Sequence, residues 1–178
     1  MRRRMTSTDQ RWRTSGPPLL GCMAWVGLVS LVAGALGCGN PKLIPNTKVA
    51  DSELNREILG VVERYRKAME RRDAAGVLAL VHPTYRDNGG TPEANDDLDL
   101  ESLKQLLAGR FKLATKVRYR IEYQRLGTKG REAEVDTWID ATFIYEVPNA
   151  TPRWRRYTDN NRFRLLKDGR TWRFISGL

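Results

Sequence analysis

The chain has 178 residues, of which 40% are hydrophobic and 29% charged, and a formal net charge of +10. The composition is that of a globular protein, the length allows about one domain, and no low-complexity tract or internal repeat stands out. His82 is the only histidine and there are only two cysteines, which excludes a metal centre built from several histidines and cysteines.

The N-terminal segment has the pattern of an export signal. Five arginines lie between residues 2 and 13, and the mostly apolar run Leu19 to Gly37 follows them. A basic start, an apolar centre and small residues before a cut are typical of such signals, with Met1 or Met5 as the first residue. The apolar run, about 28 Å long if helical, is also long enough to stay as an uncleaved membrane anchor. In both cases we expect the rest of the chain on the far side of the membrane.

The sequence Ala35-Leu36-Gly37-Cys38 resembles the lipobox of bacterial lipoproteins, in which the cysteine is lipidated and becomes the first mature residue. The resemblance implies a signal peptide over residues 1–37, lipidated Cys38 with a tether over residues 38–50, and a domain over residues 51–178. It also implies an exported lipoprotein of a bacterial cell envelope, held to the membrane by the lipid on Cys38. The residue after the cysteine is not Asp, which is compatible with an outer membrane and a domain facing the periplasm.

Three helices are expected at the start of the domain. Asp51 or Ser52 can cap the first, and Asp73 can cap a short second helix that ends before Pro83. In the first helix apolar residues recur every three or four positions, at Leu54, Ile58, Val62, Tyr65 and Met69. The third has an apolar stripe at Leu100, Leu103, Leu107 and Phe111. These spacings are typical of helices that bury one face.

From Val117 onward the apolar residues alternate with polar ones, which predicts strands. Turn sequences near residues 127–130, 147–152 and 167–169 divide this region into four strands. We therefore expect an α+β domain: three N-terminal helices packed on the apolar face of a mostly antiparallel sheet.

This order of elements, with "ILGVVERYRKAMERRDAAGVLALVHPTYRD" and "RFRLLKDGRTWRFISGL", resembles the nuclear transport factor 2-like superfamily. The superfamily includes ketosteroid isomerases, scytalone dehydratase, polyketide cyclases and non-catalytic binding domains. The resemblance covers roughly residues 51–178 and implies a sheet wrapped around the helices as a cone with an interior pocket. We expect the pocket to be lined by Tyr65, Tyr119, Phe143, Asn161 and Phe163.

The ketosteroid isomerases of this superfamily use a tyrosine donor, an aspartate base and a second aspartate on a late strand. The tyrosine position falls on Tyr65, and the late-strand position falls on Asn161, which cannot act as a protonated carboxylic acid. Asp87 reaches the base position only if the loop before it is shortened by two residues. Core packing of Tyr65 and a turn-forming role of Asp87 remain the alternatives.

The sequence also suggests contact surfaces. Trp138 is expected on the outer face of the sheet, where it could join a second copy or another protein partner. Arginines between Arg153 and Arg164 could attract an anionic envelope polymer, and nucleic acid is not expected as a partner outside the cell. Six charged residues of this face are spaced for cross-strand ion pairs, namely Arg118, Arg120, Asp136, Asp140, Arg162 and Arg164.

The incomplete match to the isomerase pattern favours a lipid-anchored, non-catalytic ligand-binding or scaffolding domain. The alternative is a small-molecule isomerase, dehydratase or cyclase with Tyr65 as donor, Asp87 as base and Asn161 as the partner of an oxyanion. No cofactor and no metal is expected in either case.

Overall fold

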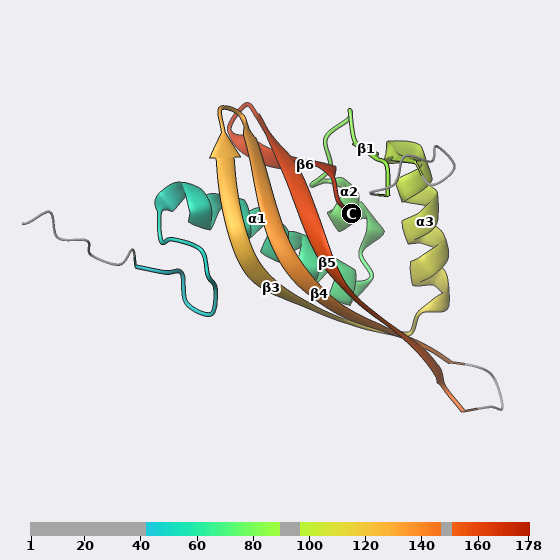
Figure 1. The fold of residues 1–178 in the computed structure, drawn as a ribbon. Helices are drawn as coiled ribbons and strands as arrows, with labels where there is room; N and C mark the ends of the chain where they lie inside the picture. Colours follow the sequence, from blue (N-terminus) through green and yellow to red (C-terminus); the bar gives the residue numbers. More distant parts are fainter. Residues whose placement is uncertain (1–41, 90–96, 147–150) are drawn as a thin grey trace, which may run out of the picture. The chain divides into compact units, whose positions relative to one another are not determined.

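The computed structural model describes residues 42–89, 97–146 and 151–178. Helices α1 (Glu53–Arg71), α2 (Ala74–Leu78) and α3 (Leu100–Leu113) precede the main sheet (Figure 1). Its strands, in spatial order, are β3 (Lys116–Lys129), β4 (Glu132–Tyr145), β5 (Arg153–Asp168) and β6 (Thr171–Ser176). A separate antiparallel ladder joins β1 (Arg86–Asp87) and β2 (Leu98–Asp99). The α+β class and the antiparallel pairing of the sheet are confirmed.

The signal-peptide, lipobox and lipidation predictions concern residues 1–41, which lie outside the described part of the chain. Across the described ranges, none of the helices combines the length and the apolar character that a membrane crossing requires.

Each helix begins at a polar residue whose side chain caps it. Ser52 before α1, Asp73 before α2 and Asp99 before α3 each accept a hydrogen bond from the backbone amide three residues later, over 3.1, 2.7 and 2.8 Å. Such bonds satisfy amides that have no partner within the first helical turn. Of the two candidates for the first cap, the structure selects Ser52.

Helix α2 is shorter than the apolar run that follows Asp73 predicts. It ends at Leu78, and the next residues pair with the edge of the sheet instead. The amide of His82 donates to the carbonyl of Phe174 over 2.8 Å, and the amide of Phe174 donates to the carbonyl of Leu80 over 2.9 Å. These bonds cover the free edge of β6, which accounts for the early end of the helix.

The helices lie on one face of the sheet (Figure 1), and the side chains of that face form the core. Buried core residues from the sheet include Val117, Tyr119, Ile121, Val135, Phe143, Phe163, Leu165 and Phe174. Helix α1 contributes Ile58, Val61, Val62, Tyr65 and Met69, and α3 contributes Leu103, Leu107 and Phe111. In β3 and β4 and at the end of β5, the alternation of apolar and polar residues therefore places the inner face as expected.

Residues ahead of α1 also join this core. Leu43 and Ala50 form a bridge, Val49 is buried, and the amide of Lys48 donates to the carbonyl of Tyr123 over 3.3 Å. Part of the segment expected as a tether therefore packs against β3.

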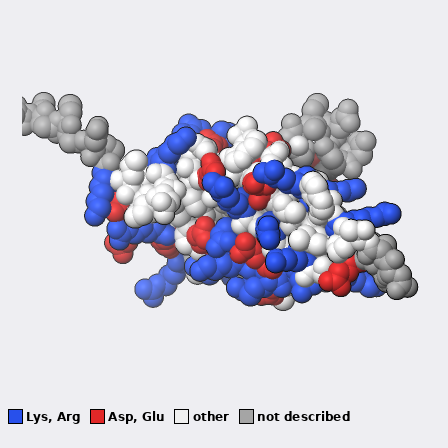
Figure 2. Space-filling model, turned by 90° about the horizontal axis from the view of Figure 1, so that it is seen from below, with Lys and Arg blue, Asp and Glu red and all other residues white. Residues whose placement is uncertain are grey.

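The outer face of the sheet carries ion pairs across the strands. Asp136 accepts hydrogen bonds from Arg125 at 2.8 Å and from Arg162 at 2.6 Å, and Asp140 accepts two from Arg156 at 2.8 Å. Arg125 and Arg156, which are not among the six residues expected to form such pairs, therefore take part in them. Figure 2 shows acidic and basic side chains interspersed over one face of the molecule, with the basic ones more frequent.

Strand β5 is paired very unevenly. It pairs with β4 from Arg153 to Leu166, but with β6 only over the segment Arg164–Asp168. Among the described residues, Arg153–Phe163 therefore has a strand neighbour on one side only.

The chain leaves β6 through Gly177, which has a φ of 96°. A Cβ atom at this position would collide with the backbone of Arg162 in β5. Glycine is therefore required here both by its conformation and by the close approach of the two backbones.

The first prediction concerns the carboxyl of Asp136. Hydrogen bonds from Arg162, with a contribution from Arg125, hold its pKa below the usual value. We expect Arg162→Gln to raise this pKa toward about 3.9, the value of a free aspartate, as measured by an NMR titration of the carboxyl carbon. Because the folded-state pKa is the lower one, the stabilisation is complete above about pH 4 and is lost as the pH falls through the folded value. Arg164→Gln is the control, and an unchanged pKa of Asp136 in Arg162→Gln contradicts the prediction.

The second prediction concerns Gly177. We expect Gly177→Ala to lower the free energy of unfolding by about 2–3 kcal/mol, because it combines backbone strain with a steric clash. Denaturant unfolding monitored by circular dichroism measures the change. Gly127→Ala is the matched control, since no atom lies within 4 Å of a Cβ at that position. Equal unfolding free energies of the two variants would contradict the predicted clash between a Cβ atom at position 177 and the backbone of Arg162.

Candidate functional site

Tyr65 lies inside the core, on α1. Its side chain is 3% exposed and its hydroxyl is 3.0 Å from that of Tyr119 on β3, so that one of the two donates to the other. Burial raises the pKa of Tyr65 well above its usual value, and the neighbouring Tyr119 raises it further. Burial also raises the pKa of Tyr119. Both hydroxyls therefore stay protonated at neutral pH and can serve as neutral hydrogen-bond donors.

The ring of Tyr65 is surrounded by other aromatic rings. Its centre lies 5.6 Å from those of Tyr119 and Phe163 and 5.5 Å from that of Phe174, each in an edge-to-face arrangement. Of the five residues expected to line the pocket, Tyr119 and Phe163 therefore each contact a third, Tyr65. Their rings occupy the space between α1 and the sheet.

Asp87 lies in β1, where its carboxylate is held by three donors. Oδ2 accepts from the amide of Gly177 at 2.6 Å and from the hydroxyl of Tyr85 at 3.3 Å, and Oδ1 accepts from the amide of Gly89 at 3.2 Å. A carboxylate offers about four lone-pair positions. Counting donors from the described residues alone, these bonds leave about one position for a further donor.

Asn161, on β5, meets the same part of the chain. Its Nδ2 donates to the carbonyl of Gly177 at 2.9 Å, while Asp87 accepts from the amide of that glycine. The structure thus brings two of the three expected catalytic residues to one backbone position. No contact joins Tyr65 to either of them in the described residues.

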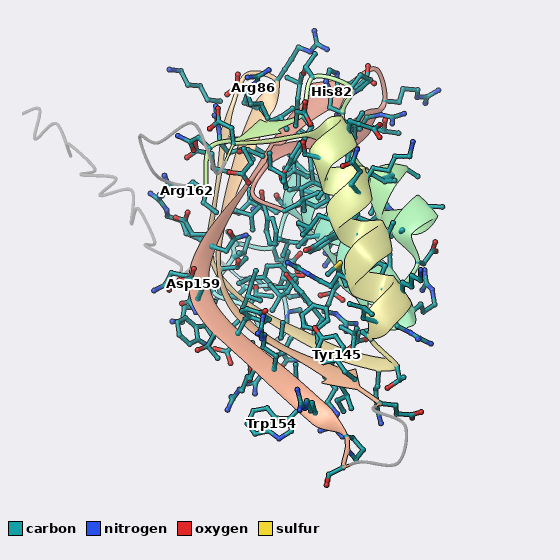
Figure 3. All side chains as sticks on the ribbon, turned by 90° about the vertical axis from the view of Figure 1, so that its right-hand side faces the viewer. His82, Arg86, Tyr145, Trp154, Asp159 and Arg162 are labelled. Atoms are coloured by element: carbon teal, nitrogen blue, oxygen red, sulfur yellow. The ribbon has the colours of Figure 1, made fainter. Side chains whose placement is uncertain are left out.

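Asp87 and Asn161 line a hollow of about 500 Å³ at the open edge of β5. The other lining residues are Asn88, Gly89, Asp159, Asn160, Arg162, Arg164, Ser176, Gly177 and Leu178. Asp159 and Arg162 are labelled on β5 in Figure 3. Polar and charged groups of both signs therefore converge on this hollow, which we call the Asp87 hollow.

Sequence reasoning missed Tyr85, which does not line the Asp87 hollow but is bonded to Asp87 in its wall. Tyr85 is 2% exposed, donates to Asp87, and accepts from the amide of Leu178 at 3.1 Å. The only signal in the sequence is its position two residues before Asp87, in a segment too short to show alternation.

Arg110 is the second residue that sequence reasoning missed. It follows Leu107 by three residues and Leu103 by seven, so it extends the apolar stripe of α3 with a charge. Its guanidinium carbon lies 5.4 Å from the ring centre of Phe143, the fourth expected pocket residue, which is 1% exposed. A basic residue on an otherwise apolar helical stripe is a signal that the sequence does contain.

No group of three or more His, Cys, Asp and Glu side chains suited to hold a metal ion occurs in the ranges 42–89, 97–146 and 151–178.

Comparison with known proteins identifies the fold and no closer relationship. No protein-family sequence profile matches the chain, and no curated protein matches it. Solved structures do match. One is a protein from Streptomyces avermitilis that is named as a proposed dehydratase of the nuclear transport factor 2-like family. It has a TM-score of 0.58 at 11% identity, and the match covers 69% of this chain and 92% of that protein.

Two further structures give the same result. A protein from Novosphingobium aromaticivorans, named as a proposed scytalone dehydratase, has a TM-score of 0.60 at 13% identity. The match covers 70% of this chain and 80% of that protein. A conserved protein from Planctomyces limnophilus has a TM-score of 0.60 at 11% identity, over 69% and 91%. At such identities the likeness concerns the fold alone. The chain therefore has the fold of the nuclear transport factor 2-like superfamily.

Proposed function

We propose that the domain is a small-molecule enzyme of the dehydratase, isomerase or cyclase kind, and that its substrate binds in the Asp87 hollow. The observation that carries the proposal is the convergence of Asp87 and Asn161 on Gly177, at the wall of one hollow. Two structural neighbours are named as proposed dehydratases, and this supports an enzyme more than it supports a purely binding domain.

In this proposal Asp87 removes a proton from the substrate. Its remaining lone-pair position serves as the base, while the bonds from Gly177 and Tyr85 fix the orientation of the carboxylate. The amide of Asn161 carries a second hydrogen besides the one given to Gly177, and this hydrogen stabilises negative charge that develops on a substrate oxygen.

Tyr65 would act from inside the cone, as part of an interior pocket expected of the fold. Its hydroxyl is a neutral donor because burial raises its pKa. Access to that hydroxyl requires a substrate to replace Tyr119 as its partner. Tyr65 is therefore the least accessible member of the proposed set.

A second candidate is a non-catalytic ligand-binding or scaffolding domain. It is favoured by the mutual hydrogen bond of Tyr65 and Tyr119 and by the rings that fill the space around them. A domain of this kind could use the outer face of the sheet, where Trp138 is half-buried, to contact a second copy or another protein.

We also propose that the domain is held to a bacterial envelope membrane through a lipid on Cys38. The lipobox-like sequence ahead of Cys38 supports this, as does the basic and apolar leader before it. The basic excess of the domain would then favour anionic polymers of the envelope as neighbours.

The third prediction tests the base. We expect the full chain to convert enolisable or dehydratable compounds, and Asp87→Asn to lower kcat/KM at least about 100-fold because general-base catalysis is lost. Asparagine offers only one acceptor oxygen, so the variant also loses at least one of the hydrogen bonds to Asp87, and its kcat/KM is measured at a temperature well below its Tm. Asp140→Asn, on the outer face, is the control and should keep the activity. Saturable binding of the same compounds by the wild type without turnover would contradict the enzyme and favour the second candidate.

The fourth prediction tests the anchor. We expect Cys38→Ser to move the protein from the membrane fraction to the soluble fraction when cells are fractionated, because the lipid that holds the domain can no longer be attached. Cys22→Ser is the control and should leave the protein in the membrane. Retention of Cys38→Ser in the membrane would instead indicate that the apolar run is an uncleaved anchor.

A further inference from the structure

The arginines of β5 fall into two groups that differ in their partners. On the outer face, Arg156, Arg162 and Arg164 each form an ion pair with a carboxylate of β4. On the inner face, Arg153 and Arg155 have no ion-pair partner in the described residues. The same strand thus carries neutralised cations on one side and uncompensated cations on the other.

The inner-face group is part of a cluster with aromatic rings. Arg155 lies opposite Phe143 in the register of β4 and β5, and its Nη1 donates to the hydroxyl of Tyr157 at 3.3 Å. The ring of Tyr157 lies 6.0 Å from that of Phe143, edge to face. From α3, the guanidinium carbon of Arg110 lies 5.4 Å from the centre of the same Phe143 ring. Two guanidinium groups from different elements therefore flank one aromatic pair.

The cluster offers both charge and an accessible apolar surface. Phe143 is 1% exposed and forms the floor, while Tyr157 is 43% exposed. Asp159 lies on the same face two residues beyond Tyr157, but it forms no ion pair with Arg153 or Arg155 among the described residues. Like charges that share a surface and are not neutralised by an ion pair raise the local potential and attract an anion.

The cluster lies on the helix side of the sheet. Tyr145, at the end of β4, pairs in register with Arg153, and Figure 3 shows it on the side of α3. Trp154, which is 70% exposed, is labelled on the opposite side in the same view. The inner-face cations therefore face the space beside α3, not the ion-paired outer face.

We propose that Arg110, Arg155 and Tyr157 form a binding site for a small organic anion. The planar guanidinium groups pair with its carboxylate in a forked geometry, and its apolar body lies on the exposed part of Tyr157. This proposal goes beyond the proposed function, because neither Arg110 nor Arg155 lines the Asp87 hollow. A small anion fits better than a polymer because the cations gather around one aromatic pair, while the outer-face arginines already have carboxylate partners.

The fifth prediction uses benzoate as the probe and inorganic phosphate as the comparison, titrated into the full chain by calorimetry at about 50 mM salt to limit screening. We expect benzoate to bind and Arg155→Gln to weaken its affinity at least about tenfold, the effect of losing a charged hydrogen bond. Arg156→Gln is the matched control, because that arginine lies on the same strand with Asp140 as its partner. It should keep the affinity.

Three further variants separate binding from folding. Arg110→Gln should weaken benzoate about as much as Arg155→Gln, and Arg110→Lys, which keeps the charge, should restore part of the affinity if the fold is intact by its Tm. Tyr157→Leu should weaken benzoate but not phosphate. No benzoate binding by the folded wild type, or an equal loss in Arg156→Gln, overturns the site. Phosphate binding as tight as that of benzoate overturns the apolar contact, and tight binding of heparin with no response to benzoate indicates a polymer surface.

Discussion

The packing of Tyr65 is the contact on which the rest of the fold depends. Its ring touches Tyr119 of β3, Phe163 of β5 and Phe174 of β6, so one side chain of α1 contacts three of the four strands. Phe163 and Phe174 in turn lie 5.5 Å apart. Burying such large rings contributes a substantial part of the hydrophobic stabilisation of a domain of this size. In the part of the chain that the structure describes, the hydroxyl of Tyr65 has Tyr119 as its single hydrogen-bond partner.

Much of the fold could be predicted from the sequence because its periodicities are strong. The caps at Ser52, Asp73 and Asp99 and the alternation from Val117 onward each have a local physical cause. The early end of α2 could not be predicted, because it depends on pairing with β6, which is about 90 residues away in the sequence. Local propensity does not contain such long-range hydrogen bonds.

The site was less predictable than the fold, for a related reason. Asp87 and Asn161 could be proposed from a resemblance, but their shared partner Gly177 is defined by the geometry of the chain after β6. Arg110 carried a signal that was available, a charge on an apolar stripe. Tyr85 carried almost none, because a buried tyrosine in a two-residue strand cannot be told from a surface one by its spacing.

The uneven pairing of β5 affects how fast its backbone amides exchange their hydrogens with solvent. Between Arg153 and Phe163 the strand has a neighbour on one side only in the described part of the chain, so half of its backbone amides point away from any partner strand. Those amides exchange with solvent hydrogen through small openings, while the amides directed at β4 exchange only when the ladder separates. The arginines along this edge also repel a second copy that approaches edge to edge, which keeps a long unpaired strand from seeding aggregates.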